Sequence, residues 1–234
     1  LRLLCEQVRR ALRFLPEHAQ TSELDLAERA FKITRALGTQ LPAIRALLVS
    51  DIQAAFAGDP AARHITEILL CYPGVLAVMH HRLAHVLHRL GVPLLARFIN
   101  EIAHSATGID IHPGAQIGPS FFIDHGTGVV IGETAVIGER VRLYQAVTLG
   151  AKSFPSGSDG ALVKGRARHP IVEDDVVIYA GATILGRVTI GRGAIIGGNV
   201  WLTHSVAPGA SVSQGSVREG GASADPDTGK RGRK

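Results

Sequence analysis

The sequence predicts an α+β protein in which an N-terminal α-helical domain is followed by a parallel β-helix built from six-residue repeats. Three observations lead to this prediction. A large aliphatic residue recurs at every sixth position from Val172 to Leu202, a period that fits neither a helix nor a half-buried strand. The same spacing begins upstream at Ile111. Residues 1 to about 105 instead carry their apolar residues at helical spacing.

The six-residue repeat is densest between Val172 and Val206. Each large aliphatic residue is followed four positions later by a small or β-branched one. A solenoid of very short strands stacks equivalent residues coil upon coil, and this stacking produces such a period. The corners of the coils suit the glycines Gly181, Gly191 and Gly197, because a Cβ would hinder the backbone there. The repeated positions are Val172, Ile178, Ile184, Ile190, Ile196 and Leu202, with partners Val176, Ala182, Val188, Ala194, Val200 and Val206.

Residues 1–107 are predicted to form a helical domain that serves oligomerisation. Helices of this length bury one face against each other or against a partner chain. Ser22, with Asp25 three residues later, predicts the N-terminal cap of one helix. Breaks between helices are expected near Pro16, Gly38 and Gly58-Asp59-Pro60. The expected helical segments are 1–15, 22–37, 41–58, 61–72, 74–91 and 92–108.

Residues 108–213 are predicted to form the β-helix, with one irregular corner. The period of six holds through Ile123 and resumes at Ile131, eight residues later. This jog of two residues falls directly after Asp124-His125. A bulged coil re-aims its side chains, and bulges of this kind favour functional sites. A neutral insertion between two turns is the alternative.

Two segments interrupt or follow the repeat. Residues 151–168 lose the period and are rich in Gly, Ser, Lys and Arg, which predicts a loop that leaves one corner. Because loops on rigid scaffolds often carry function, the end of this loop at Arg168-His169 is a candidate edge of a site. Residues 214–234 have almost nothing to bury and are predicted to be a disordered tail.

Composition excludes several classes of protein. No apolar run approaches the roughly 20 residues that span a bilayer, and no cleavable leader opens the chain, so we expect a cytoplasmic protein without membrane contact. The two cysteines, Cys5 and Cys71, have no metal-ligand spacing, and no metal is expected. The net charge of +5 suits an anionic ligand such as a phosphorylated cofactor. No basic-aromatic platform for nucleic acid is present.

Five motifs together resemble the serine O-acetyltransferase family of the cysteine pathway. The resemblance implies a left-handed parallel β-helix of hexapeptide repeats, trimers formed through the prisms, and pairing of trimers through the helical domains. It also implies acetyl transfer from acetyl-CoA to the hydroxyl of L-serine, giving O-acetyl-L-serine and CoA. The motifs are DIQAAFAGDPAA (51–62), DIHPGAQIG (110–118), DHGTGVVIGETAVIG (124–138), RHP (168–170) and YAGATILGRVTIGRGAIIGG (179–198).

A serine hydroxyl is a poor nucleophile at neutral pH and needs a base within hydrogen-bond reach. Histidine is the side chain best suited to this task, and His125 on the jog is the candidate base. The resemblance implies that Asp110 orients the His125 ring. No acyl-enzyme nucleophile is evident, which favours direct transfer between two bound substrates.

The remaining site residues follow from the resemblance. It implies that Asp59 and Asp124 meet the ammonium group of serine and that Arg168 binds its carboxylate, where a planar guanidinium can hold two oxygens. His169 is similar to the second active-site histidine, which holds serine or the developing oxyanion. The alternatives are an Asp-Pro turn for Asp59, turn-stabilising side chains for Asp110 and Asp124, and a solvated loop end for the others.

Acetyl-CoA is the implied co-substrate, and its pantetheine arm needs backbone amides along one edge of the prism. Ala180, Gly181 and Gly198 match the family's positions for these contacts, where small side chains let a ligand approach the backbone. Ordinary tight corners are the alternative for these three positions.

Other histidines crowd the segment 74–91. His81, His85 and His88 have helical spacing, but no cysteine or carboxylate completes a metal site, so a helix-helix interface or a solvated face is favoured. His112 is interpreted as a turn residue.

Competing hypotheses remain at this stage. The fold is also compatible with acetyl transfer to a sugar, homoserine or a xenobiotic alcohol, with a non-catalytic scaffold, or with a zinc hydrolyase. The resemblance raises cysteine synthase as a partner, but familiar members end in a tail closing on Ile, whereas this chain ends in basic residues. A stable complex with cysteine synthase is therefore not expected.

Overall fold

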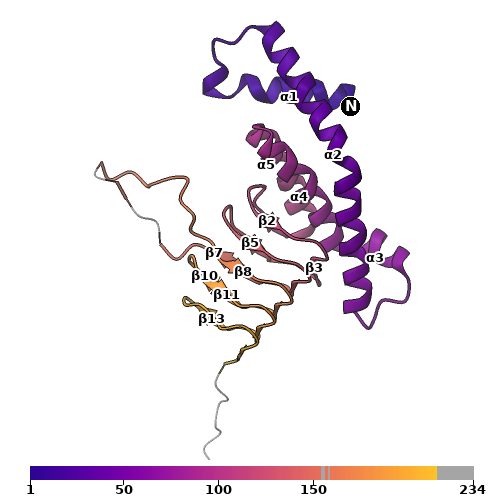
Figure 1. Cartoon of the computed structure of the whole chain (residues 1–234), viewed down its shortest axis with the longest axis vertical. Coiled ribbons are helices and arrows are strands. Elements are labelled where there is room, and N and C mark those ends of the chain that lie inside the picture. The colour runs from indigo at the N-terminus through magenta and orange to yellow at the C-terminus, as the bar shows by residue number, and fades with distance from the viewer. Residues whose placement is uncertain (154–155, 158, 215–234) are drawn as a thin grey trace, which may run out of the picture.

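Helices occupy the N-terminal half of the molecule and a prism of short parallel strands the C-terminal half (Figure 1). The structure is a computed structural model and describes residues 1–153, 156–157 and 159–214. The predicted tail therefore lies, apart from Gln214, outside the described residues. Figure 1 shows the helices gathered over one end of the prism, while the loop after β7 projects from its side.

The helices end where the strand repeat begins. The last helix ends at Thr107 and the first strand begins at Asp110. Ser22 caps the longest helix as predicted, because its Oγ accepts a hydrogen bond of 3.1 Å from the Asp25 amide. The helices are α1 Arg2–Arg13, α2 Glu23–Gly58, α3 Ile65–Cys71, α4 Pro73–Arg89 and α5 Pro93–Thr107, with a 3-10 turn at Pro16–His18.

The predicted break near Gly38 is wrong. Helix α2 runs without interruption through Gly38 and also contains Pro42. Both residues weaken a helix interior by local propensity. Packing outweighs this weakness, since α2 contacts α1, α3, α4 and strand β3.

Helix α2 is also long and apolar enough, by length and composition alone, to cross a membrane. The core helix of a water-exposed domain passes the same test. Residues along α2, including Leu26, Ala30 and Leu37, belong to the buried core of the helical half. Only 17% of the apolar window of α2 is buried, so one face of α2 packs in this core and much of its apolar surface stays exposed in the single chain.

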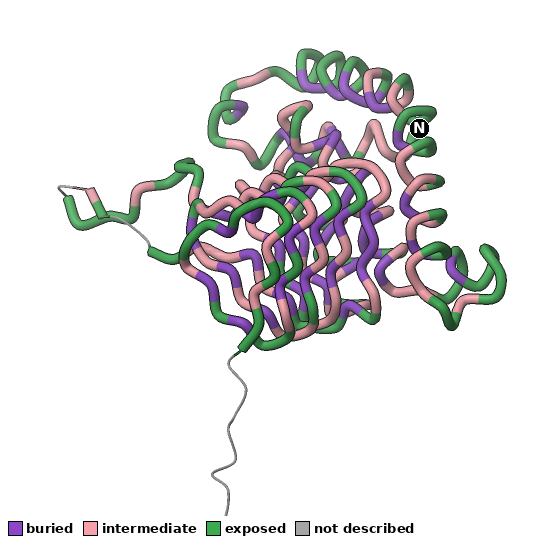
Figure 2. Tube along the Cα trace, turned by 60° about the horizontal axis from the view of Figure 1, so that its bottom comes forward, coloured by how far each residue is buried: buried purple, intermediate pink, exposed green. Residues whose placement is uncertain are grey.

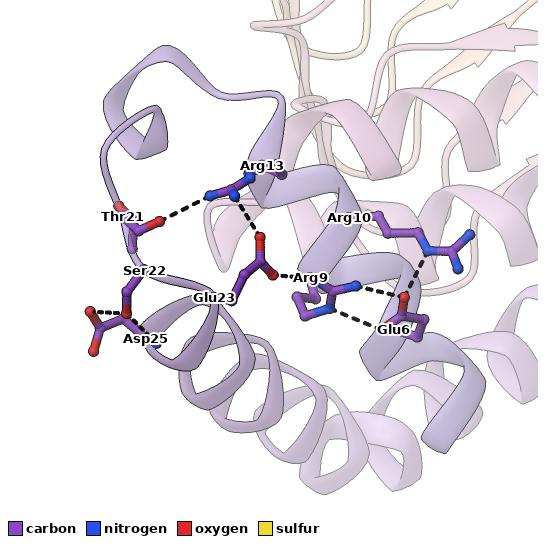
Figure 3. A network of polar contacts seen from close by, with 8 residues as sticks. All are labelled: Glu6, Arg9, Arg10, Arg13, Thr21, Ser22, Glu23 and Asp25. Atoms are coloured by element: carbon purple, nitrogen blue, oxygen red, sulfur yellow. Dashed lines mark hydrogen bonds and ion pairs between the residues drawn. The ribbon is translucent and has the colours of Figure 1, made fainter.

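A network of charged side chains joins α1 to the start of α2 (Figure 3). Glu6 accepts from Arg9 at 2.9 Å and from Arg10 at 2.8 Å. Arg9 also pairs with Glu23, which in turn accepts from Arg13 at 2.6 Å. Because these groups are partly exposed, the network orients the two helices more than it stabilises them.

The prism has three faces, each a parallel sheet. Sheet A has the strand order β1-β4-β7-β10-β13, sheet B the order β11-β8-β5-β2, and sheet C the order β14-β12-β9-β6-β3. The strands are β1 Asp110–Ile111, β2 Gln116–Ile117, β3 Phe122–Ile123, β4 Val130–Ile131, β5 Val136–Ile137, β6 Arg142–Leu143, β7 Thr148–Gly150, β8 Ile171–Val172, β9 Val177–Ile178, β10 Thr183–Leu185, β11 Thr189–Ile190, β12 Ile195–Ile196, β13 Trp201–Leu202 and β14 Ser211–Val212.

The buried aliphatic residues of successive coils stack inside the prism. Figure 2 shows them as continuous inner stripes. Leu143, Ile178, Ile184 and Ile190 are fully buried. Each coil alone is too short to bury its apolar residues, so the stack supplies the core.

The register shows where one coil is longer. Ile131 pairs with Leu149, eighteen residues later, but Ile111 pairs with Ile131, twenty residues later. The two additional residues lie in the corner between β3 and β4, where the sequence places the jog.

A buried ion pair joins the helices to the prism. Arg82 of α4 donates to Asp51 of α2 at 2.6 and 2.7 Å and also donates to the Gly118 carbonyl at 2.9 Å. Asp51 in turn accepts from the Phe121 amide at 2.9 Å. Desolvation raises the pKa of Asp51, although the bonds from Arg82 favour its charged form.

His81, His85 and His88 of α4 contact the prism, so the predicted helix-helix interface or solvated face is wrong as to what these histidines meet. His81 is buried, and His85 Nδ1 lies 2.9 Å from the Pro113 carbonyl. His88 meets the ring of His112 edge-on. His112 Nδ1 accepts from the Gly114 amide at 2.9 Å, which is the turn contact expected for His112. In the described ranges, no group of three or more His, Cys, Asp or Glu could hold a metal ion.

Candidate active site

His125 lies on the corner that contains the two additional residues. Its φ of 56° is left-handed, and Gly126 follows with a φ of 90°. This backbone turns the His125 side chain outward, where it is 71% exposed. The Asp124 side chain stays 14% exposed, with its Oδ1 3.9 Å from His125 Nδ1. Other non-glycine corner residues, such as Ala146 and Asn199, have the same left-handed φ, so this conformation belongs to the corners of the prism in general.

Asp59 reaches the same corner from the helical half. It ends α2 as the C-terminal cap, and the charge of His125 contributes to the lowered pKa of its carboxyl group. The main cause of this lowered pKa is a hydrogen bond of 2.5 Å that the Tyr72 hydroxyl donates to Asp59 Oδ2. The structure therefore gathers Asp59, Asp124 and His125, three residues singled out in the sequence.

Asp110 begins strand β1 on sheet A, where its amide donates to the Val129 carbonyl at 2.9 Å. Both Asp110 and His125 belong to the described residues, and the structure contains no hydrogen bond between their side chains. The orienting role of Asp110 therefore stays a prediction.

Arg168 and His169 lie at the end of the loop 151–168. His169 is 7% exposed, and its Nδ1 accepts from the Thr134 amide at 3.0 Å. Because Nδ1 accepts, the neutral ring carries its proton on Nε2. Burial is the main cause of its lowered pKa, so the neutral ring is favoured at pH 7.

Arg168 pairs with Glu133, whose carboxylate accepts from Nη2 at 2.8 Å. Arg187, on the next coil, donates to the His169 carbonyl at 3.0 Å and so contacts the end of the loop as well. A pocket of about 660 Å³ opens here, between these side chains and the loop. Lys152, Lys164 and Arg166 also line it, so basic side chains outnumber the single acidic one, Glu133, in its wall.

The two histidines lie on different edges of the prism. His125 belongs to the corners that lead from sheet C to sheet A, namely 124–129, 144–147, 179–182 and 197–200; we call this the C/A edge. His169 belongs to the A/B edge, formed by the corners 112–115, 132–135, 151–170 and 186–188. Within one chain, the prism therefore separates the two predicted site histidines.

The residues expected to meet acetyl-CoA lie on the C/A edge, on coils below His125. Ala180 and Gly181 form one corner, and Gly198 lies on the next coil. The Gly181 amide donates to the Gln145 carbonyl at 3.0 Å and is therefore occupied. For the amides of Ala180 and Gly198, the described structure contains no protein acceptor, so both can donate to a ligand.

Glycine is required at position 181 for a steric reason rather than for ligand binding. Its φ is 73°, and a Cβ there would lie 2.2 Å from Asn199 Oδ1. The fit of the edge to a pantetheine arm therefore rests on the Ala180 and Gly198 amides rather than on Gly181.

Sequence reasoning missed Tyr72, Glu133, Thr134 and Arg187. Each contacts a predicted site residue that is distant in the sequence. Thr134 and His169, for example, are separated by 35 positions and meet only in the fold. No spacing or motif within the sequence signals these pairings.

Comparisons with known proteins agree on one class. The profile described as bacterial transferase hexapeptide (six repeats) matches residues 169–204. "Serine acetyltransferase, plasmid" of Synechococcus elongatus is 62% identical over 221 residues, which are 93% of this chain and 69% of that protein. Serine acetyltransferase of Bacillus licheniformis is 46% identical over 166 residues, which are 71% of this chain and 73% of that protein.

Solved structures give the same result. Serine acetyltransferase 1 of Entamoeba histolytica, in complex with L-cysteine, superposes with a TM-score of 0.80 at 43% identity, covering 91% of this chain and 75% of that one. Serine acetyltransferase of Neisseria gonorrhoeae, in complex with serine, gives 0.69 at 32% identity, covering 91% and 80%. With the three sheets described above, these matches confirm the predicted fold class, helices followed by a left-handed parallel β-helix of hexapeptide repeats.

Proposed function

This chain belongs to the serine acetyltransferase family, and we propose that His125 is the general base with which it acetylates L-serine. The products are O-acetyl-L-serine and CoA, and the reaction is the first step of cysteine biosynthesis. One observation supports the role of His125 above all. Its exposed ring lies on the irregular corner, beside the carboxylates of Asp59 and Asp124.

The reaction requires one proton to move twice. The serine hydroxyl oxygen attacks the thioester carbonyl carbon of acetyl-CoA while its proton passes to the His125 ring. The C–S bond then breaks, and His125 returns the proton to the departing sulfur. Asp110 orients the ring in this scheme, and the remaining acceleration comes from holding two substrates together.

The acceptor is a zwitterion and needs charges of both signs. Asp59 and Asp124 bind its ammonium group, and Arg168 binds its carboxylate. Arg168 is already paired with Glu133, so it presents only part of its guanidinium to the substrate. His169, neutral and with its proton on Nε2, can donate to the developing oxyanion.

The acting unit is a homo-oligomer, because the proposed groups are divided between two edges of the prism. A trimer that places the C/A edge of one subunit beside the A/B edge of the next would join His125 to His169 of the partner subunit. Acetyl-CoA would lie along the C/A edge, with its arm on the amides of Ala180 and Gly198. We place this reaction of amino-acid synthesis in the cytoplasm.

Initial rates of CoA release test the proposal. We expect turnover with L-serine and little with an acetyl-accepting sugar, which lacks both charged poles, or with L-homoserine, whose additional methylene displaces the hydroxyl from the base. Replacing the base in His125→Ala should reduce turnover with L-serine by about a hundredfold or more.

His104→Ala serves as the matched control, since His104 lies on α5 and its ring pairs with Glu101 rather than with a residue of the proposed site. A wild-type protein that prefers the sugar would overturn the substrate assignment. Full activity of His125→Ala would overturn the assignment of the base.

A further inference from the structure

Tyr72 joins two helices directly above the irregular corner. It is the C-terminal cap of α3 and the N-terminal cap of α4. The first turn of α4 rests on β3, since a Cβ at Gly74 would lie 2.3 Å from the Ile123 carbonyl oxygen. Because Ile123 immediately precedes Asp124, this contact fixes Tyr72 relative to the corner.

Both carboxylate oxygens of Asp59 are held. Oδ2 accepts from the Tyr72 hydroxyl at 2.5 Å, and Oδ1 accepts from the Ala61 amide at 2.8 Å. A charge-assisted bond of this kind is stronger than a neutral one and fixes the orientation of the carboxylate. Each oxygen keeps a further lone pair for a ligand.

Several charged groups surround this pair. Glu67 of α3, Asp124 and His125 of the corner, and Arg142 of β6 all act on it electrostatically. The shared hydrogen bond lowers the pKa of Asp59 and raises that of Tyr72 to about 12, so the carboxylate is charged and the phenol neutral at pH 7.

Arg142 is a nearby cation that acts on Asp59 through its charge. Its guanidinium lies against Gly58, the residue before Asp59, because a Cβ at Gly58 would lie 2.3 Å from Arg142 Nη2. Without the Tyr72 hydroxyl, the Asp59 side chain could rotate toward this cation. Such a pair would neutralise the carboxylate and withdraw it from the corner.

We propose that Tyr72 is a positioning residue that holds the Asp59 carboxylate where the ammonium group of the acceptor amino acid binds. This inference rests on the proposed function and adds to it a determinant of acceptor specificity. Tyr72 acts through Asp59 and takes no part in proton transfer to His125.

Tyr72→Phe removes the hydroxyl and keeps the ring. We expect the KM for L-serine to rise about tenfold, since the loss of a hydrogen bond to a charged group weakens binding by about this factor. The kcat should stay within about twofold and the KM for acetyl-CoA should not change, because only acceptor binding is affected. Thr39→Val is the control for the KM of L-serine, as it removes a hydroxyl that donates only to the Ala36 carbonyl within α2.

A second acceptor separates positioning from general loosening of the site. 3-Hydroxypropanoate has the hydroxyl and carboxylate of serine but no ammonium group. We expect the wild type to prefer L-serine strongly in kcat/KM, and Tyr72→Phe to reduce this preference about tenfold. Asp59→Asn weakens the same hydrogen bond by changing its acceptor, and it should also reduce the preference for L-serine. Adding Tyr72→Phe to Asp59→Asn should reduce this preference little further.

The outcomes are distinct. An equal loss with both acceptors, or an unchanged KM for L-serine, would overturn the role of Tyr72 while leaving the proposed function intact. A wild-type protein without any serine-dependent release of CoA would overturn the proposed function itself, and the role of Tyr72 with it.

Discussion

Gly132 lies directly against the ring of His169: a Cβ on Gly132 would lie 2.0 Å from Cδ2 and 2.1 Å from Nε2 of that histidine. Thr134, two residues after Gly132, holds the opposite side of the ring by donating from its amide to Nδ1 at 3.0 Å. The ring therefore has one position, between a residue without a side chain and a backbone donor.

Gly132→Ala should displace the His169 ring and break its bond to the Thr134 amide. We expect kcat/KM for L-serine to fall by about a hundredfold, because a displacement of this size misplaces a group that contacts the reacting atoms. Steady-state kinetics measure the loss. Unchanged kinetics would show that His169 does not contact the reacting centre.

Gly38→Ala is the same substitution as Gly132→Ala, but within helix α2 rather than at the proposed site. The nearest atom to a Cβ at Gly38 is Leu1 Cδ1 at 3.7 Å, an ordinary contact. Alanine should therefore raise the free energy of unfolding by about 0.5–1 kcal/mol, the usual difference from glycine inside a helix. Chemical unfolding measures this change, and activity should be unaffected. A loss of stability would mean that α2 requires the conformational freedom of glycine before Pro42.

Mixing two inactive variants tests the division of the site between subunits. His125→Ala and His169→Ala should each be impaired, since each lacks one of the two histidines. Random trimers formed by co-expression should recover about a quarter of the wild-type activity, because one site in four pairs intact residues across a subunit boundary. No recovery above the two separate variants would place both histidines of a working site in the same chain.

The buried His81 predicts a loss of stability in mild acid. Burial holds its pKa well below 6.5, with the charges of His85, Arg82 and His112 acting in the same direction and the Ala115 backbone opposing them. Below pH 6.5 the unfolded chain therefore binds a proton that the folded chain does not. The free energy of unfolding should decrease by roughly 1.4 kcal/mol per pH unit from this histidine alone.

Urea unfolding at pH 7.5 and pH 5.5 measures this dependence, and His81→Gln should make it less steep. His85 and His112 add to the same trend, since burial also lowers their pKa values, that of His112 to about 4. An identical pH dependence in His81→Gln and wild type would contradict the assignment to His81.

Much of the prism could be predicted from the sequence. Ile178, Ile184, Ile190 and Ile196 repeat at six and all four are buried in the core, because each coil of fixed length contributes one inward-facing aliphatic residue to each of the three faces. The jog after Asp124-His125 was visible for the same reason, as it alters that length. The continuity of α2 was not predictable, because packing against four other elements overrides the local weakness at Gly38.

By itself, the sequence determined the repeat, its irregular corner, and the residue types from which an acetyl-transfer site could be proposed. Only the tertiary structure decided where these residues meet. It assigned His125 and His169 to different edges, brought Tyr72 to Asp59 and placed Gly132 against His169. The physical reason is that a six-residue period depends on neighbours along the chain, whereas contacts between coils and between helices depend on how many residues each corner contains and how each helix packs.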